Sequence, residues 1–348
     1  MKRGVVPWRC TFGVAQVLFA YSRTGSSMGR NAKDHEISTV PLDAVDRWIA
    51  ALGTIPPAAR VYDVTPRRAE LEFGITSAIA NLLSDRGLPR SSFEGEARFA
   101  WSDLHYIALR LGSARLYLRT MRSWAQSVAN AAHGGSQMIA LRYRTYASPG
   151  ATVDVLLPEG QRAKAVIGPD QIVARFNVRM ANREIAFPPS VQQVLHEAAA
   201  FDFYILPPTL AGDLDFARRR GLAGCLTASR FVVSECQQRG IEARMAYGLL
   251  LAPPLGTPHE WAEIRLGDIW APADPLLLSI LGRFAGLDAS RWPCTHSPNA
   301  VLLRLAARKT PIVDGAGGPV ETSFMVSFGE QTTSPRSSFR APSPRGLA

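Results

Sequence analysis

Apolar residues in the first third of the chain recur at the three- and four-residue intervals of a helix with one buried face. The segments with this spacing are residues 41–53, about 66–86 and about 102–128. A Pro56-Pro57 pair interrupts the chain after the first of them. The intervals predict a mainly helical first third.

Farther along the chain, apolar and polar residues alternate, which is the two-residue period of a half-buried β-strand. The alternating segments are residues 138–146, 153–157 and 172–180. Because short turns separate them, they predict an antiparallel sheet. A helix is then expected after Pro188-Pro189, with Ser190 as its N-cap.

The last third combines one helical pattern with a second set of strand patterns. Helical spacing runs from Cys225 to Arg239, and Gly240 suits the end of a helix. The strand patterns that follow are residues 245–251, 260–266 and 269–271. One helix followed by antiparallel strands predicts an α+β fold.

Length and composition allow two domains. The chain has 348 residues, of which 47% are hydrophobic, as in proteins that bury a core. The expected regions are a poorly ordered N-terminus over 1–38, a helical then β-rich region of unknown role over 39–189, a domain with the candidate chemistry over 190–330, and a disordered tail over 331–348. The tail is predicted from its Ser, Pro and Arg content.

The net charge of +10 comes in part from the two ends of the chain. No acidic residue precedes Asp34, and the C-terminus carries Arg336, Arg340 and Arg345 without an acidic residue. Neither aromatic residues among the basic ones nor a nucleic-acid reading module is present, which argues against nucleic-acid binding. Solvated tails are the simplest interpretation, and an acidic protein partner is the alternative.

The cysteines favour a reducing compartment, and so a cytoplasmic protein. Their positions, Cys10, Cys225, Cys236 and Cys294, do not form a disulfide framework. The apolar run 10–21 is preceded by Pro7, Trp8 and Arg9 and lacks a small-x-small cleavage site, which argues against a signal peptide. The acid-free start would also suit a transit peptide. Because no apolar run is long enough for a membrane span, we expect no membrane partner.

A thiol, an imidazole and a carboxylate follow one another in the last third, as Cys225, His259 and Asp274. A thiol is a weak nucleophile near neutral pH until an imidazole takes its proton, and a third group fixes the tautomer of that imidazole. Cys225 is expected in the first turn of a helix, where the helix dipole favours a thiolate and backbone N–H groups can face an oxyanion. These residues are a candidate catalytic triad.

Each residue of the triad also has an ordinary structural explanation. A free cysteine such as Cys225 is among the most buried residue types. His259 lies near Trp261, and such a histidine is commonly a hydrogen-bonded core residue. Asp274 precedes a proline, and aspartate before proline often forms turns. The order and spacing of the three residues therefore carry more weight than any one of them.

Motifs surround the triad. They are Gly-Ile-Glu-Ala-Arg at 240–244, His-Glu-Trp-Ala-Glu at 259–263 and Trp-Ala-Pro-Ala-Asp-Pro at 270–275. With Cys225 at a helix start, this region of about residues 210–282 resembles the catalytic core of the transglutaminase-like superfamily. Two departures are Glu242, where proline is usual, and the Gly-Leu-Ala-Gly segment before Cys225.

The resemblance implies a papain-like fold in which the helix bearing Cys225 packs on an antiparallel sheet. It also implies that His259 deprotonates Cys225, that Asp274 orients His259, and that an acyl-thioester enzyme forms from a peptide, glutamine or carrier-bound donor. An amine or water acceptor then resolves the thioester, and no cofactor is needed. The side-chain donor to the oxyanion is left open.

Two alternatives stay open beside acyl transfer to an amine. One is a cysteine peptidase or amidase that uses water as the acceptor, and the other is a catalytically inert binding or scaffold module. A metal site from Cys236, His259, Cys294 and His296 lacks any established ligand spacing, so no metal is expected. The glycine-rich segment 315–318 lacks the lysine of a phosphate-binding loop and predicts a turn.

Overall fold

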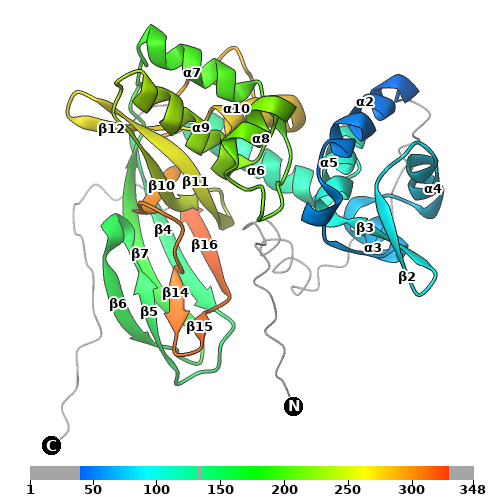
Figure 1. Cartoon of the computed structure of the whole chain (residues 1–348). Coiled ribbons are helices and arrows are strands. Elements are labelled where there is room, and N and C mark those ends of the chain that lie inside the picture. The colour runs from blue at the N-terminus through cyan, green and yellow to red at the C-terminus, as the bar shows by residue number, and fades with distance from the viewer. Residues whose placement is uncertain (1–39, 132–134, 329–348) are drawn as a thin grey trace, which may run out of the picture. The chain divides into compact units, whose positions relative to one another are not determined.

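The chain folds into helices and mainly antiparallel strands, as an α+β protein (Figure 1). A computed structural model describes residues 40–131 and 135–328. The segments expected to be poorly ordered, 1–38 and 331–348, lie outside the described residues, and so does Cys10. The described residues form two compact units, each assembled from three stretches of the chain.

The first unit comprises residues 40–126, 185–245 and 260–297, and the second comprises residues 127–184, 246–259 and 298–328. Each unit is assembled from separate stretches of the sequence, whereas the sequence predicted consecutive regions that divide near residue 190. The N-terminal helices and the segment with Cys225 and Asp274 belong to one unit.

The N-terminal part of the first unit contains more elements than the helical pattern predicts. Its helices are α2 (Leu42–Gly53), α3 (Pro66–Phe73), α4 (Ser77–Asp85), α5 (Trp101–Leu111) and α6 (Arg115–Ala131). The predicted helices 66–86 and 102–128 are each broken in two, because Gly74 and Gly112 end α3 and α5 in the left-handed conformation that glycine favours. The predicted mainly helical character also missed a sheet of order β1-β3-β2, with bounds Tyr62–Val64, Glu96–Ala100 and Arg90–Phe93.

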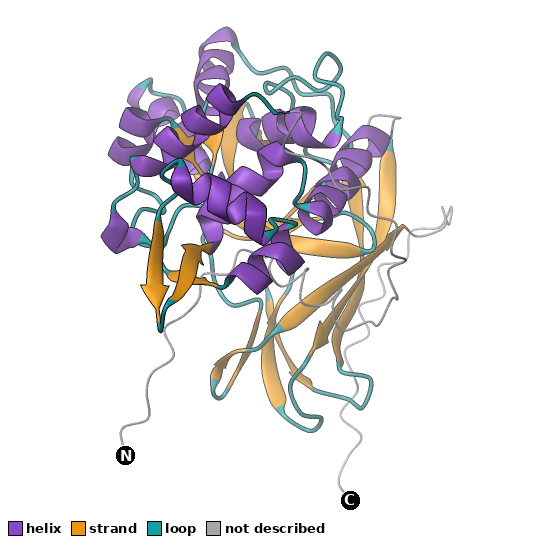
Figure 2. Cartoon of the chain, turned by 90° about the vertical axis from the view of Figure 1, so that its right-hand side faces the viewer, coloured by secondary structure: helices purple, strands orange, loops and turns teal. Residues whose placement is uncertain are grey.

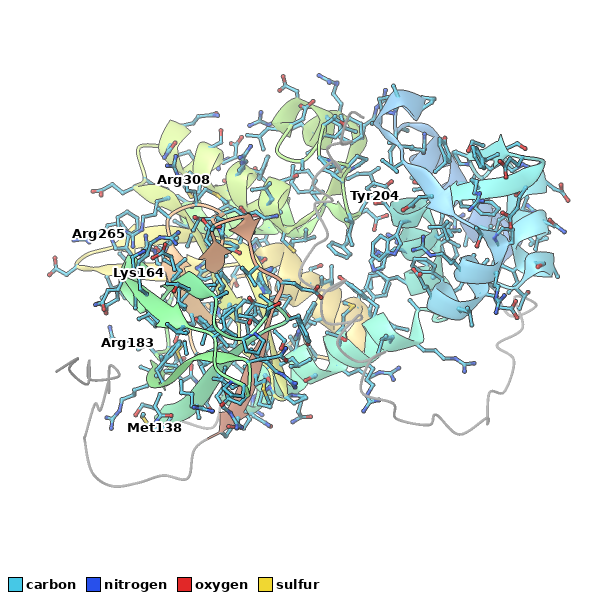
Figure 3. The ribbon with its side chains drawn as sticks, turned by 90° about the horizontal axis from the view of Figure 1, so that it is seen from below. Met138, Lys164, Arg183, Tyr204, Arg265 and Arg308 are labelled. Atoms are coloured by element: carbon cyan, nitrogen blue, oxygen red, sulfur yellow. The ribbon has the colours of Figure 1, made fainter. Side chains whose placement is uncertain are left out.

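A buried ion pair fixes α5 in this unit. Arg60 Nε lies 2.8 Å from a carboxylate oxygen of Asp103, and the two side chains are 2% and 0% exposed. The hydroxyl of Tyr204, labelled in Figure 3, donates to the other carboxylate oxygen at 2.7 Å. Since a buried carboxylate is stable only when its oxygens are paired, these contacts hold α5 beside the segment that includes Tyr204.

The rest of the first unit places helices on a sheet. The helices are α7 (Pro189–Ala199), α8 (Leu214–Arg220), α9 (Cys225–Gln238) and α10 (Pro275–Ala285). The strands are β8 (Asp202–Phe203), β9 (Leu222–Ala223) and β12 (Ile269–Ala273), with parts of β10 (Ala243–Leu250) and β11 (Leu255–Leu266). Apolar residues of α7 and α9 share one core with residues of β10, β11 and β12. The predicted helix at Cys225 and the strands after it are confirmed.

The second unit is built mainly of strands (Figure 2). Its strands are β4 (Ser136–Thr145), β5 (Thr152–Leu156), β6 (Arg162–Val166), β7 (Ile172–Ala181), β13 (Leu302–Ala306), β14 (Val313–Gly315), β15 (Gly318–Pro319) and β16 (Thr322–Phe328). One sheet has the order β13-β10-β11-β16-β4-β7, and a second has the order β15-β14-β5-β6. Side chains of both sheets form one apolar core. The alternation that predicted β4, β5 and β7 is thus confirmed.

Gly248 on β10 lies where the backbone of the neighbouring strand β13 leaves no room for a side chain. A Cβ atom at Gly248 would lie 1.9 Å from the carbonyl oxygen of Leu303 on β13. We expect Gly248→Ala to lower the free energy of unfolding by about 1–3 kcal/mol, measured by urea unfolding, because the strands must move apart. Gly53→Ala is the control, since a Cβ there meets no atom within 4 Å. Equal stability of the two variants would contradict the close approach.

Candidate active site

Cys225 is the first residue of α9, as predicted. The preceding residue is Gly224, which has no side chain to cap the backbone N–H groups of the first turn. The thiol is free and half-buried. A free thiol at the positive end of a helix dipole, close to N–H groups that no side chain caps, is a favourable setting for a nucleophile.

Side-chain hydrogen bonds hold the first turns of α9 in place. The backbone N–H of Gly212 donates to Thr227 Oγ1 at 3.1 Å. The hydroxyl of Ser229 donates to the carbonyl oxygen of Glu260 at 3.3 Å. Ser229 lies one turn after Cys225 on the same face of the helix, and Glu260 directly follows His259 in β11. The helix face that bears Cys225 is therefore bonded to the strand at the residue after His259.

His259 lies within β11, which begins at Leu255 and is longer than the predicted strand 260–266. Its side chain is 9% exposed. Strand geometry puts His259 on the same face as Trp261 and Glu263, and both of these are also buried. His259 is the last residue of its stretch of the second unit, and the next residue of the same strand belongs to the first. A direct contact between the His259 imidazole and the Cys225 thiol stays a prediction.

Asp274 has a structural role that its sequence context indicates. It is the N-cap of α10, and a carboxylate oxygen accepts a hydrogen bond from the backbone N–H of Leu277 at 3.0 Å. The residue before it, Ala273, pairs with Ala262 in the β11–β12 ladder. Asp274 therefore comes directly after the paired part of β12, at the end of the ladder that lies nearer to His259 along β11. Its side chain is buried. The capping role leaves its predicted orienting role untested.

The other motif residues contact one another. Arg244 Nε lies 2.7 Å from a carboxylate oxygen of Glu263. The guanidinium carbon of Arg244 also lies 4.0 Å from the ring centroid of Trp270. One residue from each motif, on β10, β11 and β12, therefore takes part in a single cluster. Packing and charge within the sheet beneath α9 therefore account for the arginine, the glutamate and the tryptophan of these motifs.

An aromatic group on α5 and α6 was not predicted as part of the site. His105 stacks on Trp101 at a centroid distance of 5.0 Å and meets Tyr117 edge-on at 4.2 Å. Burial, and to a smaller extent the charge of Arg110, lower the pKa of His105 from 6.5 to about 3. Burial raises the pKa of Tyr117 well above its usual value, and the charge of Cys225 raises it further.

The other described cysteines are poorer nucleophiles at neutral pH. Burial raises the pKa of Cys236 to about 11 and also raises the pKa of Cys294. The described part of the chain contains no group of three or more His, Cys, Asp or Glu residues that could hold a metal ion. None of the described helices combines the length and apolarity that a bilayer span requires.

No family model, curated protein or solved structure matches the chain.

Proposed function

We propose that this protein is a thiol-dependent acyl-transfer enzyme of transglutaminase-like type, with Cys225 as nucleophile, His259 as general base and Asp274 as the group that orients His259. One observation carries the proposal: the half-buried Cys225 begins α9, and the same helix is hydrogen-bonded through Ser229 to the residue after His259. The packing of α9 on β10, β11 and β12 supports a papain-like arrangement.

The proposed reaction has two stages. In the first, His259 takes the thiol proton and Cys225 attacks the carbonyl carbon of an acyl donor, giving a tetrahedral oxyanion. Collapse of this species breaks the bond to the leaving group, which receives the proton from His259, and leaves an acyl thioester on Cys225. In the second, an amine or water attacks the thioester, passes its proton through His259 to the departing sulfur, and releases the amide or acid.

The choice of acceptor separates acyl transfer from hydrolysis. An amine gives amide formation or exchange, and we propose this outcome, whereas water gives a peptidase or amidase. The donor class remains a peptide, a glutamine side chain or a carrier-bound thioester. An acidic protein partner and a cytoplasmic location remain proposals that rest on charge and cysteine usage.

Mass spectrometry of the intact protein tests the proposed function. The protein is incubated with peptide, glutamine and thioester donors, with and without a primary amine. We expect the mass of one acyl group on Cys225, and a new amide product when the amine is present. A carboxylic acid as the product in both samples would support the hydrolase. No acyl-enzyme and no product with any donor would support an inert binding module.

A further inference from the structure

The second unit has an exposed sheet face that carries arginine side chains and no carboxylate. Alternate residues of β4 are buried in the apolar core of this unit, and the residues between them face outward. The exposed arginines of β4 and β7, which we call the arginine face, are Arg142, Arg144, Arg175 and Arg179. Strands β4, β7 and β16 contain no Asp or Glu at any position.

Strand pairing places these side chains on one face of the sheet. Arg142 lies directly opposite Arg175 in the β4–β7 ladder, and Arg179 lies opposite Met138, four residues before Arg142. Directly paired residues of an antiparallel sheet point to the same face. With about 3.4 Å per residue and about 4.8 Å between strands, Arg142 and Arg179 are roughly 14 Å apart. An extended acidic segment of about four residues spans this distance.

Most of this positive charge is not neutralised within the described part of the chain. Arg175 pairs with Asp170 in the turn before β7. Arg142, Arg144 and Arg179 form no ion pair with any described residue. Like charges directly opposite each other destabilise a sheet. An anionic partner over Arg142 and Arg175 would remove that repulsion.

The residues beside the arginine face favour a protein over a nucleic acid as the anionic partner. The outward positions next to the arginines hold Met138 and Ala140 on β4 and Met325 on β16. Methionine and arginine are both enriched in protein interfaces. No aromatic side chain of β4, β7 or β16 shares this face, so it offers no ring on which a base could stack.

The sheet face that carries these arginines continues to His259. Met325 on β16 lies opposite Arg142 on one side and opposite Leu255 of β11 on the other. From Leu255, β11 leads through Thr257 to His259, at alternate positions that share one face. Both Thr257 and His259 are buried, and the residue between them is less so. The arginine face and His259 therefore share one face of the same sheet within the second unit.

We propose that the arginine face docks an acidic protein and that this protein presents the acyl donor to the proposed site. Docking depends only on the charge and the neighbouring residues of this face, whereas presentation of the donor rests on the proposed function. Of the donors considered above, a group carried by an acidic protein is then the favoured one.

Binding of a fluorescein-labelled decaglutamate peptide, measured by fluorescence anisotropy, tests the docking. We expect Arg142→Gln/Arg179→Gln to weaken binding about tenfold at low salt, and added salt to weaken binding by wild type. The matched control is Arg308→Gln/Lys309→Gln, which removes the same charge from exposed positions after β13, at the opposite edge of the sheet from β7. The control should bind as wild type does, and thermal unfolding should show that both variants are folded.

Two results would overturn the docking. Equal weakening by the two pairs of substitutions would mean that net charge alone attracts the peptide. Tighter binding of decathymidylate than of decaglutamate, lost through Arg142→Gln/Arg179→Gln, would mean that the partner is a nucleic acid.

Acylation of Cys225 by two peptide thioesters tests the presentation of the donor. One peptide is rich in glutamate, the other is rich in lysine, and both carry the same thioester. We expect wild type to react about tenfold faster with the glutamate-rich peptide, and Arg142→Gln/Arg179→Gln to lose this preference. Equal rates in wild type would overturn the presentation. If neither peptide acylates Cys225, the proposed function fails, while decaglutamate binding still decides the docking.

Discussion

Cys225→Ala is expected to lower the rate of acyl-enzyme formation and of product release by at least about 10⁴-fold. The reason is chemical, because no other group at the start of α9 can form the thioester. The fold should be retained, since the Cys225 side chain is half-buried and free, and alanine is a good helix former. The measurement is the release of p-nitrophenolate together with the intact mass after incubation with p-nitrophenyl acetate.

Three further variants make this result specific. His259→Ala should cause a similar loss. Asp274→Asn should cause a smaller loss, and asparagine can still accept the hydrogen bond from Leu277 that begins α10. Cys294→Ala should react as wild type does, because burial raises the pKa of this thiol. Full activity of Cys225→Ala, or an acyl group found on another cysteine, would contradict the mechanism.

His105→Phe is expected to remove a large part of the protein's sensitivity to acid. In the unfolded chain the imidazole has its ordinary pKa of 6.5, while in the folded protein burial lowers the pKa to about 3. Between these values the unfolded chain binds a proton that the folded protein does not, so stability falls as the pH falls through this range. The loss is roughly 2 kcal/mol between about pH 6.5 and about pH 4.5.

Urea unfolding of wild type and His105→Phe across this pH range measures the effect. The variant should lose less stability on acidification, while at neutral pH it should be about as stable as wild type because neither ring nitrogen of His105 is bonded to a described residue. His196→Gln is the control, since His196 is an exposed histidine of α7. The same acid dependence in wild type and His105→Phe would mean that the buried imidazole can take up a proton in the folded state.

The elements nearest the candidate site were the ones that local pattern predicted best. The helix at Cys225 and the strands after it have strong periods of their own, and glycine and proline mark their ends. Residues 66–86 and 102–128 look continuous by period alone, because one glycine in a helical pattern is often tolerated. Gly74 and Gly112 break these helices since the next helix must start in a new direction. The short strands β1, β2 and β3 are polar or brief and give little signal.

The candidate site could be predicted only in part. One stretch of the sequence contains Cys225, His259 and Asp274 in order, together with the motifs around them. Tyr117 and His105 lie far upstream, on helices whose apolar residues look like ordinary core positions. Only the ring contact of His105 with Phe203 on β8 connects them to the strand pair that precedes Cys225. No spacing rule connects residues that meet through tertiary packing.

The buried Asp103 also limits how far this protein can be shortened. A fragment that starts after α6 would keep every motif residue. However, Tyr204 would lose its hydrogen-bond partner Asp103, and Asp202 would lose the hydrogen bond from Tyr106. The polar groups left behind would face an exposed apolar surface where α5 had packed. We therefore expect that the shortest fragment with a reactive Cys225 must start before Arg60, well upstream of the sequence motifs around the candidate triad.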